Sequence, residues 1–228
     1  MSGDAEELVG AGAEVATRPT LPAAVLESGV IAVLRAPAAS EYLAVCRTLV
    51  AAGVVGLELT LTTPGTFGVL PELRVALPGA VIGVGTVTRV EEVEQALAAG
   101  ASFIVTPVTQ GAVIDAAVRA GVAVVPGGMT PTELHEGWTQ GAAAVKVFPA
   151  SAVGSGYLAQ LAGPFPELRA MPSGGVALDD IGAWIAAGAV AVSLGGPLLG
   201  DAFAGGDLAA LAARAERALH AVAAARHP

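Results

Sequence analysis

The chain has 228 residues, of which 54% are hydrophobic and 14% charged, and its formal net charge is −9. This much apolar material predicts a folded core and excludes a disordered chain. The negative charge argues against a nucleic-acid-binding protein, which needs a basic surface, although a small anionic substrate needs only a local positive site. A single cysteine, Cys46, excludes an internal disulfide and disfavours a cysteine-based metal site.

The amino-terminal stretch does not resemble a targeting segment. Its first residues, MSGDAEELVG, are acidic, whereas a secretory signal begins basic and then turns apolar. No uninterrupted apolar run reaches the roughly 18 residues that a transmembrane helix needs. We therefore expect a cytoplasmic protein with no membrane contact. Residues 1–20 are rich in Gly, Ala and Glu, and we interpret them as a flexible tail ahead of one domain over 21–228.

Beyond the tail, a helix is expected near 21–28, and short β-rich runs then alternate with Ala-rich segments of helical length. The runs are VIAVLR (30–35), VGLELT (55–60), VIGVGT (81–86), SFIVTP (102–107), VAVVPG (122–127), AVKVFP (144–149), LRAMPS (168–173) and AVSLGG (191–196). The helical segments include 41–53, 90–100, 178–188 and a last one at about 207–225, and several end in Gly, the usual C-cap residue.

Continuous apolar strands separated by helices predict a parallel sheet buried on both faces. Eight strand-and-helix units favour an α/β fold of the closed (β/α)8 kind, a TIM barrel in a single domain. The competing architecture is an open doubly wound sheet, which usually carries a glycine-rich first turn. Here the first strand continues into RAPAAS, which contains no glycine.

In such a barrel the active site lies at the carboxyl ends of the strands, so the last residues of each run are the candidates. They are Arg35, Glu58 to Thr63, Gly85-Thr86, Thr106-Pro107, Pro126 to Gly128, Lys146 to Pro149 (with Phe148), Ser173-Gly174-Gly175 and Gly195-Gly196.

Lys146 is the only lysine in the chain, and it stands inside an apolar strand. It could form an ion pair, or its stem could lie on apolar neighbours while its amine reaches water. Burial disfavours the charged form of an amine, so a buried lysine can also attack a carbonyl carbon as the free base. We favour the role of a nucleophile.

Glu58 is the second charged residue in an apolar strand. It could be a counter-ion for Lys146 or an arginine, or it could transfer protons in a reaction that passes through a Schiff base. A carboxyl group among apolar neighbours has a raised pKa and can exchange protons near neutral pH. The sequence leaves both roles open.

The paired glycines of PSGGV and LGGP follow the seventh and eighth strands, where many barrels bind phosphate through backbone N–H groups. Ordinary turns use glycine too. Thr86 is either a hydroxyl at the site or a helix N-cap, for which Thr88 competes. Arg35 could bind a carboxylate or phosphate as a bidentate fork, or pair with Glu58.

The remaining candidates carry no chemistry in this interpretation. The three histidines, His135, His220 and His227, lie on helices or at the carboxyl end, and we assign them no catalytic role and no metal. Met129 and Trp184 are interpreted as packing residues.

From Val30 to Leu199 the chain resembles the 2-keto-3-deoxy-6-phosphogluconate (KDPG) / 4-hydroxy-2-oxoglutarate aldolases. One signature of that family ends in Glu-apolar-Thr-apolar-Arg and here reads GVVGLELTLT, from Gly53 to Thr62. The other surrounds a Schiff-base lysine and here reads KVFPA, followed by Gly154. GVGTVT, PGGMTPTEL and PSGGV also match blocks of the family.

The resemblance implies a class I aldolase, a lyase that needs no metal or other cofactor and is typically a homotrimer. Lys146 would form the Schiff base with the C2 ketone of a phosphorylated keto acid, and Glu58 would shuttle protons through water. Cleavage between C3 and C4 would release pyruvate and an aldehyde, which is glyceraldehyde 3-phosphate in the phosphogluconate case.

Two positions depart from the family pattern. The arginine that clamps the carboxylate is Thr62 here, as in galactonate-type relatives with a small polar residue, and carboxylate binding would then fall to Arg35, Thr86 and backbone N–H groups. A serine that often helps to hold phosphate is Pro197, which has neither a hydroxyl nor an N–H.

Several substrates and functions therefore stay open. The gluconate and galactonate epimers are equally compatible with the sequence, and 4-hydroxy-2-oxoglutarate is a further alternative. A phosphosugar isomerase or epimerase would use Glu58 as base and Lys146 only as a charge. A metabolite-binding barrel without activity would explain the changes at Thr62 and Pro197 as decay.

Overall fold

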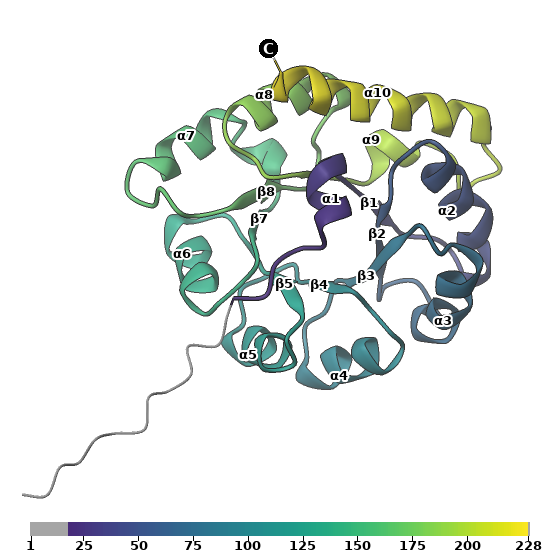
Figure 1. Ribbon diagram of the computed structural model, residues 1–228, viewed down its shortest axis with the longest axis horizontal. Coiled ribbons are helices and arrows are strands. Elements are labelled where there is room, and N and C mark those ends of the chain that lie inside the picture. The colour runs from purple at the N-terminus through teal and green to yellow at the C-terminus, as the bar shows by residue number, and fades with distance from the viewer. Residues whose placement is uncertain (1–17, 228) are drawn as a thin grey trace, which may run out of the picture.

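The computed structural model describes residues 18–227, which form parallel strands surrounded by helices (Figure 1). The strands are β1 Val30–Leu34, β2 Gly56–Thr60, β3 Val81–Gly85, β4 Phe103–Val105, β5 Ala123–Val125, β6 Gly127–Gly128, β7 Val145–Val147, β8 Ala170–Pro172 and β9 Val192–Leu194. The α-helices are α1 Ala23–Ser28, α2 Tyr42–Ala51, α3 Thr66–Ala76, α4 Val90–Ala98, α5 Gly111–Arg119, α6 Pro131–Thr139, α7 Gly156–Ala162, α8 Ile181–Ala186, α9 Gly196–Leu199 and α10 Leu208–Arg226, with short 3-10 turns at Ala39–Glu41, Ala150–Ala152 and Leu178–Asp180.

Every predicted run contains a strand, and the strands form two parallel sheets. One sheet has six strands in the order β5-β4-β3-β2-β1-β9, and the other has three in the order β6-β7-β8. The fifth run is divided into β5 and β6 at Pro126, which has no N–H to donate to a ladder. The chain thus has an α/β fold with a curled parallel sheet.

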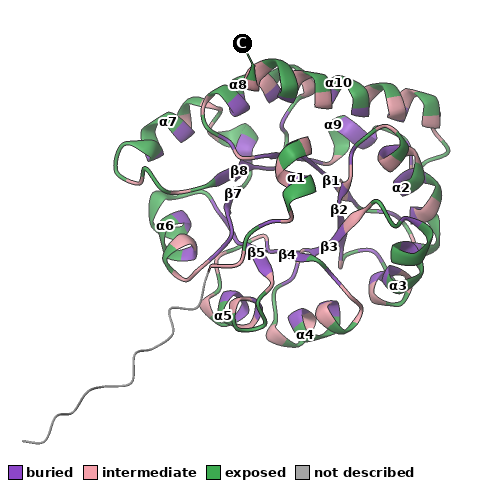
Figure 2. Cartoon of the chain, viewed as in Figure 1, coloured by how far each residue is buried: buried purple, intermediate pink, exposed green. Residues whose placement is uncertain are grey.

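Side chains alternate between two apolar environments along each strand. In β1, Val30, Ala32 and Leu34 pack outward against the helices, whereas Ile31 belongs to a separate inner cluster with Met171 and other strand residues. This alternation follows from the two-residue period of a strand. Figure 2 shows the result, with buried strands at the centre and helices that are buried only on their inner side.

The inner face has an apolar end and a polar end. Val25 of α1 joins the inner cluster near the amino ends of the strands, where α1 lies across the centre of the molecule in Figure 1. Toward the carboxyl ends, Glu58 lies beside Val33 in the β1–β2 register, and Lys146 lies beside Met171 in the β7–β8 register. The polar side chains therefore gather at the end that α1 leaves open.

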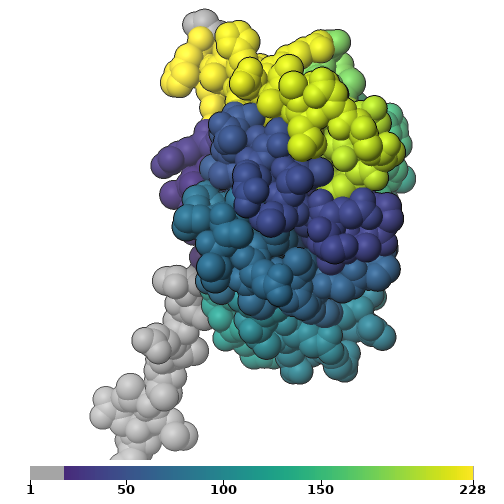
Figure 3. Space-filling model, turned by 90° about the vertical axis from the view of Figure 1, so that its right-hand side faces the viewer, coloured from purple at the N-terminus to yellow at the C-terminus, as the bar shows by residue number. Residues whose placement is uncertain are grey.

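The first and last units of the chain are neighbours. Helix α10 packs along α8 and α2, and Figure 3 shows the carboxyl-terminal segment lying directly against the early part of the chain. None of the described helices is long and apolar enough to cross a membrane.

The expected tail falls largely outside the described residues, because only its last three residues, 18–20, are among them. The Arg18 guanidinium donates to the carbonyl oxygens of Trp138 and Ala142 and stacks 3.7 Å above the Trp138 ring. Arg18 is thus in contact with the domain.

Candidate active site

A cavity of about 700 Å³ opens at the carboxyl ends of the strands. Its wall contains Val33, Arg35, Ala36, Pro37, Glu58, Thr86, Pro107, Lys146, Phe148, Ser173, Gly174, Gly175, Gly195, Gly196, Pro197, Leu199, Gly200, Asp201, Phe203 and Ala204. Candidates from seven strands or the loops that follow them lie on this wall: Arg35, Glu58, Thr86, Pro107, Lys146, Phe148, Ser173, Gly174, Gly175, Gly195 and Gly196. The other strand-end candidates, Leu59 to Thr63, Gly85, Thr106, Pro126 to Gly128, Val147 and Pro149, do not line it. Thr62 does not line the cavity, whereas Pro197 does.

Lys146 lies in the middle of β7 and reaches the cavity through its side chain. Only 6% of the residue is exposed, and its Nζ lies 4.9 Å from the centre of the Phe148 ring. Among residues 18–227, no carboxylate forms an ion pair with this amine. The geometry therefore leaves Nζ available to a ligand instead of committing it to a structural ion pair.

Glu58 is 1% exposed, and its Oε2 has no hydrogen-bond partner in the described part of the chain. Burial raises the pKa of this carboxyl, while the nearby charges of Lys146 and Arg35 and the Ser193 hydroxyl partly offset the rise. A carboxyl with a raised pKa and a free oxygen can give and take protons near neutral pH.

Gly85 makes room for this carboxyl group. A Cβ placed on Gly85 would collide with Oε1 of Glu58. The carboxyl group therefore occupies the space that the side chain of any other residue at position 85 would need. The glycine at the end of β3 thus lets Glu58 extend along the inner face.

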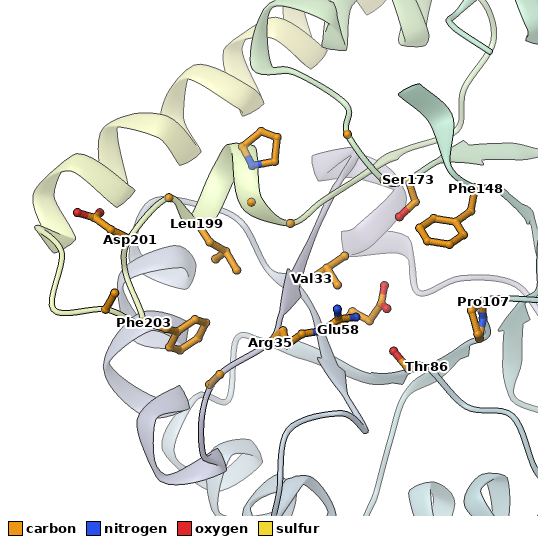
Figure 4. Close-up of a pocket in the computed structure, with 18 of the residues that line it drawn as sticks. Val33, Arg35, Glu58, Thr86, Pro107, Phe148, Ser173, Leu199, Asp201 and Phe203 are labelled. Carbon is orange, nitrogen blue, oxygen red and sulfur yellow. The ribbon is translucent and has the colours of Figure 1, made fainter. Parts of the chain in front are cut away.

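Arg35 follows β1 and is an exposed residue at the mouth of the cavity. Figure 4 shows its side chain beside that of Glu58, but no ion pair joins Arg35 to any carboxylate among the described residues. Its guanidinium is free to bind an anionic group of a ligand.

Thr86 directly follows β3 and adopts a φ of 65°, the only described non-glycine residue with a positive φ. This conformation is costly for a β-branched residue, and such strain tends to be retained at functional sites. Neither Thr86 nor Thr88 caps the next helix, because Arg89 occupies the N-cap position of α4. The Thr86 side chain points toward the cavity in Figure 4.

The glycine pair after β8 needs its glycines for two reasons. Gly174 and Gly175 have φ values of 82° and 76°, and a Cβ on either would press on Phe148 or Ser151. Their N–H groups donate no hydrogen bond within the described residues. Two free, adjacent N–H groups form a concave site of the kind that binds anions.

The opposite wall was not anticipated from the sequence. The segment Gly200–Ala204 follows α9 and contributes Phe203, while Asp201 also borders the cavity. In Figure 4 the Asp201 carboxylate points away from Arg35 and Glu58. An aromatic residue in the Gly-rich loop between α9 and α10 was the available signal.

The histidines, Trp184 and Met129, to which no chemistry was assigned from the sequence, lie in different environments. His135 lies on α6 and His220 on α10, and neither lines this cavity. Trp184 is buried, as a packing residue should be, but the same interpretation of Met129 was wrong, because 42% of it is exposed. Met129 falls in the loop after β6, where the apolar strand has already ended. Within residues 18–227, no three His, Cys, Asp or Glu side chains lie close enough together to hold a metal ion.

The profile of the family described as "Aldolase: KDPG and KHG aldolase" matches residues 21–213. A 2-dehydro-3-deoxy-phosphogluconate aldolase of Pseudoalteromonas atlantica is 35% identical over 57% of this chain, an alignment that covers only 61% of that relative. The enzyme of the same name from Dickeya dadantii is 35% identical over 76% of this chain and 82% of its own. A 2-dehydro-3-deoxy-6-phosphogalactonate aldolase of Escherichia coli is 35% identical over 74% of this chain and 83% of its own.

Solved structures agree with these relatives. A chain described as "Native KDPGal structure" superposes with a TM-score of 0.81 at 32% identity, over 87% of this chain and 96% of its own. A KDPG aldolase from Legionella pneumophila, with pyruvate captured as a covalent carbinolamine intermediate, gives a TM-score of 0.76 at 26% identity. The superposition covers 85% of this chain and 96% of that chain.

Proposed function

The chain belongs to the KDPG and KHG aldolase family, and from that membership we propose that it is a class I aldolase. It cleaves a 2-keto-3-deoxy-6-phospho-sugar acid, of the gluconate or galactonate series, to pyruvate and glyceraldehyde 3-phosphate. The observation that carries the proposal is the only lysine of the chain, buried at a cavity that also contains a carboxyl group with a raised pKa.

Lys146 is the nucleophile. Its Nζ lone pair attacks the C2 carbonyl carbon, and the resulting carbinolamine takes up one proton, delivered by the Glu58 carboxyl group or by water, and loses its oxygen as water to give a protonated imine. The imine draws in the electron pair of the C3–C4 bond as that bond breaks, so the aldehyde leaves and an enamine of pyruvate stays on the lysine. Protonation of the enamine at C3 and hydrolysis of the imine release pyruvate and the free amine.

Glu58 moves the protons of these steps. Cleavage requires removal of the proton on the C4 hydroxyl, and the enamine requires a proton at C3. One carboxyl group can accept the first and return the second, through water where it does not reach the atom directly. Its raised pKa supports this role, because a group that exchanges protons in both directions works best near the ambient pH.

The ends of the substrate are anionic, and the cavity has suitable donors for them. Arg35 and the Thr86 hydroxyl are assigned to the carboxylate, and the N–H groups of Gly174, Gly175, Gly195 and Gly196 to the phosphate. Ser173 lies on the same wall, where it can contact a substrate hydroxyl. Pro107 and Phe148 supply apolar walls that exclude water.

We also propose that the two sheets form one closed (β/α)8 barrel. Three sets of contacts support closure: Pro126 alone separates β5 from β6, the Lys146 N–H donates to the Pro126 carbonyl at 2.8 Å, and an isolated parallel bridge joins Ser173 to Ser193 beyond β8 and β9. A closed ring of strands places Lys146 and Glu58 on a common inner face.

The test of the function is release of pyruvate from purified protein. We expect turnover with at least one of the two epimeric 2-keto-3-deoxy-6-phospho-sugar acids, and the ratio of kcat/KM values identifies the true epimer. Turnover confined to 4-hydroxy-2-oxoglutarate would assign the other activity of the family. Isomerisation of a phosphosugar without pyruvate release, or ligand binding without any turnover, would contradict the proposal.

The homotrimer and the cytoplasmic location stay predictions. Sedimentation equilibrium of the full chain tests the first, and fractionation of the source cells tests the second.

A further inference from the structure

Four buried side chains with hydroxyl groups lie behind the loop that carries Arg35. They are Tyr42 of α2, Thr60 at the end of β2, Thr63 in the turn after it and Thr66 at the start of α3, and we call them the hydroxyl cluster. None of the four lines the cavity, so the chemistry proposed above uses none of them.

The cluster holds the backbone on both sides of Arg35. The Leu34 carbonyl, immediately before it, accepts hydrogen bonds from the Thr60 hydroxyl at 3.0 Å and the Tyr42 hydroxyl at 3.3 Å. The Ala36 N–H, immediately after it, donates to Thr63 Oγ1 at 3.0 Å. Both peptide groups next to Arg35 are thus tied to side chains.

These bonds begin where the sheet ends. The register of β1 with β2 stops at the pair Leu34 and Leu59, so no strand partner fixes the residues that follow β1. The hydroxyls of Thr60 and Thr63 take over from the ladder at that point. Without them, the segment after Leu34 would be an ordinary surface loop with more freedom to move.

The cluster is itself braced. The Thr66 hydroxyl lies 3.0 Å from the Thr60 carbonyl oxygen and 2.9 Å from that of Thr63, and the Thr63 N–H donates to the Thr60 carbonyl at 3.1 Å. The Tyr42 ring packs edge-on against Phe203, with ring centres 5.9 Å apart, and Phe203 lines the cavity. The turn after β2 therefore forms a fixed support for Arg35.

The position of Arg35 matters for binding an anion because, within the described residues, it is the only arginine on the cavity wall. The nearby Thr62 lies outside the wall and supplies no positive charge to the cavity. An arginine has many rotamers, and the precision with which its fork meets an anion depends on how firmly its backbone is held.

We propose that Thr63, supported by Thr60 and Tyr42, is a positioning residue that holds Arg35 in register with an anionic group of the substrate. This inference rests on the proposed function for the nature of the anion, the carboxylate or phosphate of a sugar acid. Thr63 itself touches no substrate and acts only through the Ala36 N–H and the Arg35 backbone.

The test measures binding of 6-phosphogluconate by calorimetry. This phosphorylated sugar acid has a hydroxyl at C2 instead of a ketone, so it reports anion binding without an imine. We expect Thr63→Val to raise Kd about 5- to 50-fold, the scale of one or two lost hydrogen bonds. Thr63→Ser, which keeps the hydroxyl, should restore affinity, and Tyr42→Phe should weaken binding less than Thr63→Val does.

A double-mutant cycle separates positioning from general damage. If Thr63 acts through Arg35, Thr63→Val should change Kd by less than about twofold in the Arg35→Ala background. Thr48→Val is the control, because the Thr48 hydroxyl likewise forms one hydrogen bond with the backbone, to the Ala44 carbonyl at 3.0 Å, but on α2 away from the cavity. It should leave Kd unchanged.

The proposal would be overturned by an equal loss with and without Arg35, by no rescue with Thr63→Ser, or by no binding of 6-phosphogluconate to the wild-type chain. A lower melting temperature with unchanged Kd would also overturn it, because it would assign the cluster to stability alone. None of these results depends on imine formation, so failure of the aldolase assignment is recognised separately by the absence of pyruvate release.

Discussion

Two charged side chains, one amine and one carboxyl group, face the same cavity with little contact with water. Lys146 is 6% exposed and Glu58 is 1% exposed, and no ion pair ties either of them to a fixed partner among the described residues. A buried ion pair would make each group a structural partner of the other. Their availability instead suits a reaction in which the amine forms a bond and the carboxyl group moves protons.

Replacement of Glu58 by glutamine separates these two roles. Glu58→Gln should still form the imine with pyruvate, but turnover should fall by roughly 10²–10⁴-fold, the usual scale for a lost acid–base group. The wild-type profile of kcat against pH should show a limb above the ordinary carboxyl range, because burial raises the pKa of Glu58, and the variant should lack it. Glu72→Gln, on the exposed side of α3, is the control. Full activity of Glu58→Gln would refute the proton-transfer role.

The sequence is informative for residues that break a local rule. Lys146 and Glu58 stand out because a charge is costly in an apolar strand, and both can be placed at the site from that conflict alone. Ser193 gives no such signal, although it is buried and its hydroxyl influences the pKa of Glu58. A small polar residue is compatible with almost any position, so only the three-dimensional packing shows its partner.

The loops after β8 and β9 extend the site beyond the strands. Gly174 and Gly175 turn the chain through two left-handed residues, and their N–H groups have no partner among residues 18–227, while α9 begins at the second glycine pair. This arrangement presents backbone donors without a cationic side chain. Affinity for a phosphate would then depend on the exact path of the backbone.

Alanine at Gly174 tests that dependence. Its Cβ would lie 2.8 Å from the Phe148 ring, so either the loop or the ring must move, and we expect KM for the phosphorylated substrate to rise about tenfold or more. The pyruvate imine, which has no phosphate, should form as before. Steady-state kinetics and trapping of the imine measure the two effects.

Gly121→Ala is the matched control for Gly174→Ala. Gly121 also has a positive φ, 71°, but its Cβ would meet nothing within 4 Å. It should lose about 1–2 kcal/mol of stability through the left-handed conformation while KM stays unchanged. Equal KM values for both variants would refute the role assigned to the loop.

Elements were predicted well where periodicity is strong and less well where one residue interrupts it. Every apolar run contains a strand, because a strand buried on both faces is apolar throughout. Pro126 divides the fifth run, an effect of its missing N–H that the apolar pattern does not reveal. The segment Gly200–Ala204 has no periodicity, so the apolar pattern does not predict its place on the cavity wall, and the aromatic Phe203 in a Gly-rich loop is the available signal.

At the scale of the whole molecule, a buried acid with a raised pKa costs folding free energy at neutral pH. Folded Glu58 keeps its proton to a higher pH than the unfolded chain does, so the folded state binds more protons between the two pKa values. The free energy of unfolding should therefore fall as pH rises from about 4.3, the ordinary value for Glu, through the raised pKa of Glu58, and then level off.

Urea unfolding of wild type and Glu58→Gln across this pH range measures the effect, and the stability of the variant relative to wild type should rise with pH. Glu133→Gln is a control of opposite sign. Hydrogen bonds from the Thr130 hydroxyl and from the Thr130 and Met129 N–H groups lower the pKa of Glu133, so its contribution is present above its unfolded pKa and is lost as pH falls. Parallel curves for wild type and Glu58→Gln would contradict the raised pKa.

The α/β fold with parallel strands could be inferred because one pattern, an apolar strand followed by a helix, recurs along the chain. The division of the strands into two sheets and the hydroxyl cluster behind Arg35 could not be. Both depend on contacts between residues far apart in the sequence, such as Ala36 with Thr63.

The central claim is that Lys146 forms a covalent imine with a 2-keto acid, and reduction with borohydride in the presence of pyruvate tests it most directly. Because the chain has a single lysine, the amino terminus is its only other primary amine, and intact mass with peptide mapping decides between them. The account predicts one reduced pyruvate per chain on Lys146 and none on Lys146→Arg, whose guanidinium stays protonated. Release of pyruvate from the phosphorylated substrate by wild type without any adduct on Lys146 would contradict the claim. Release of pyruvate that is retained in Lys146→Arg would also contradict it.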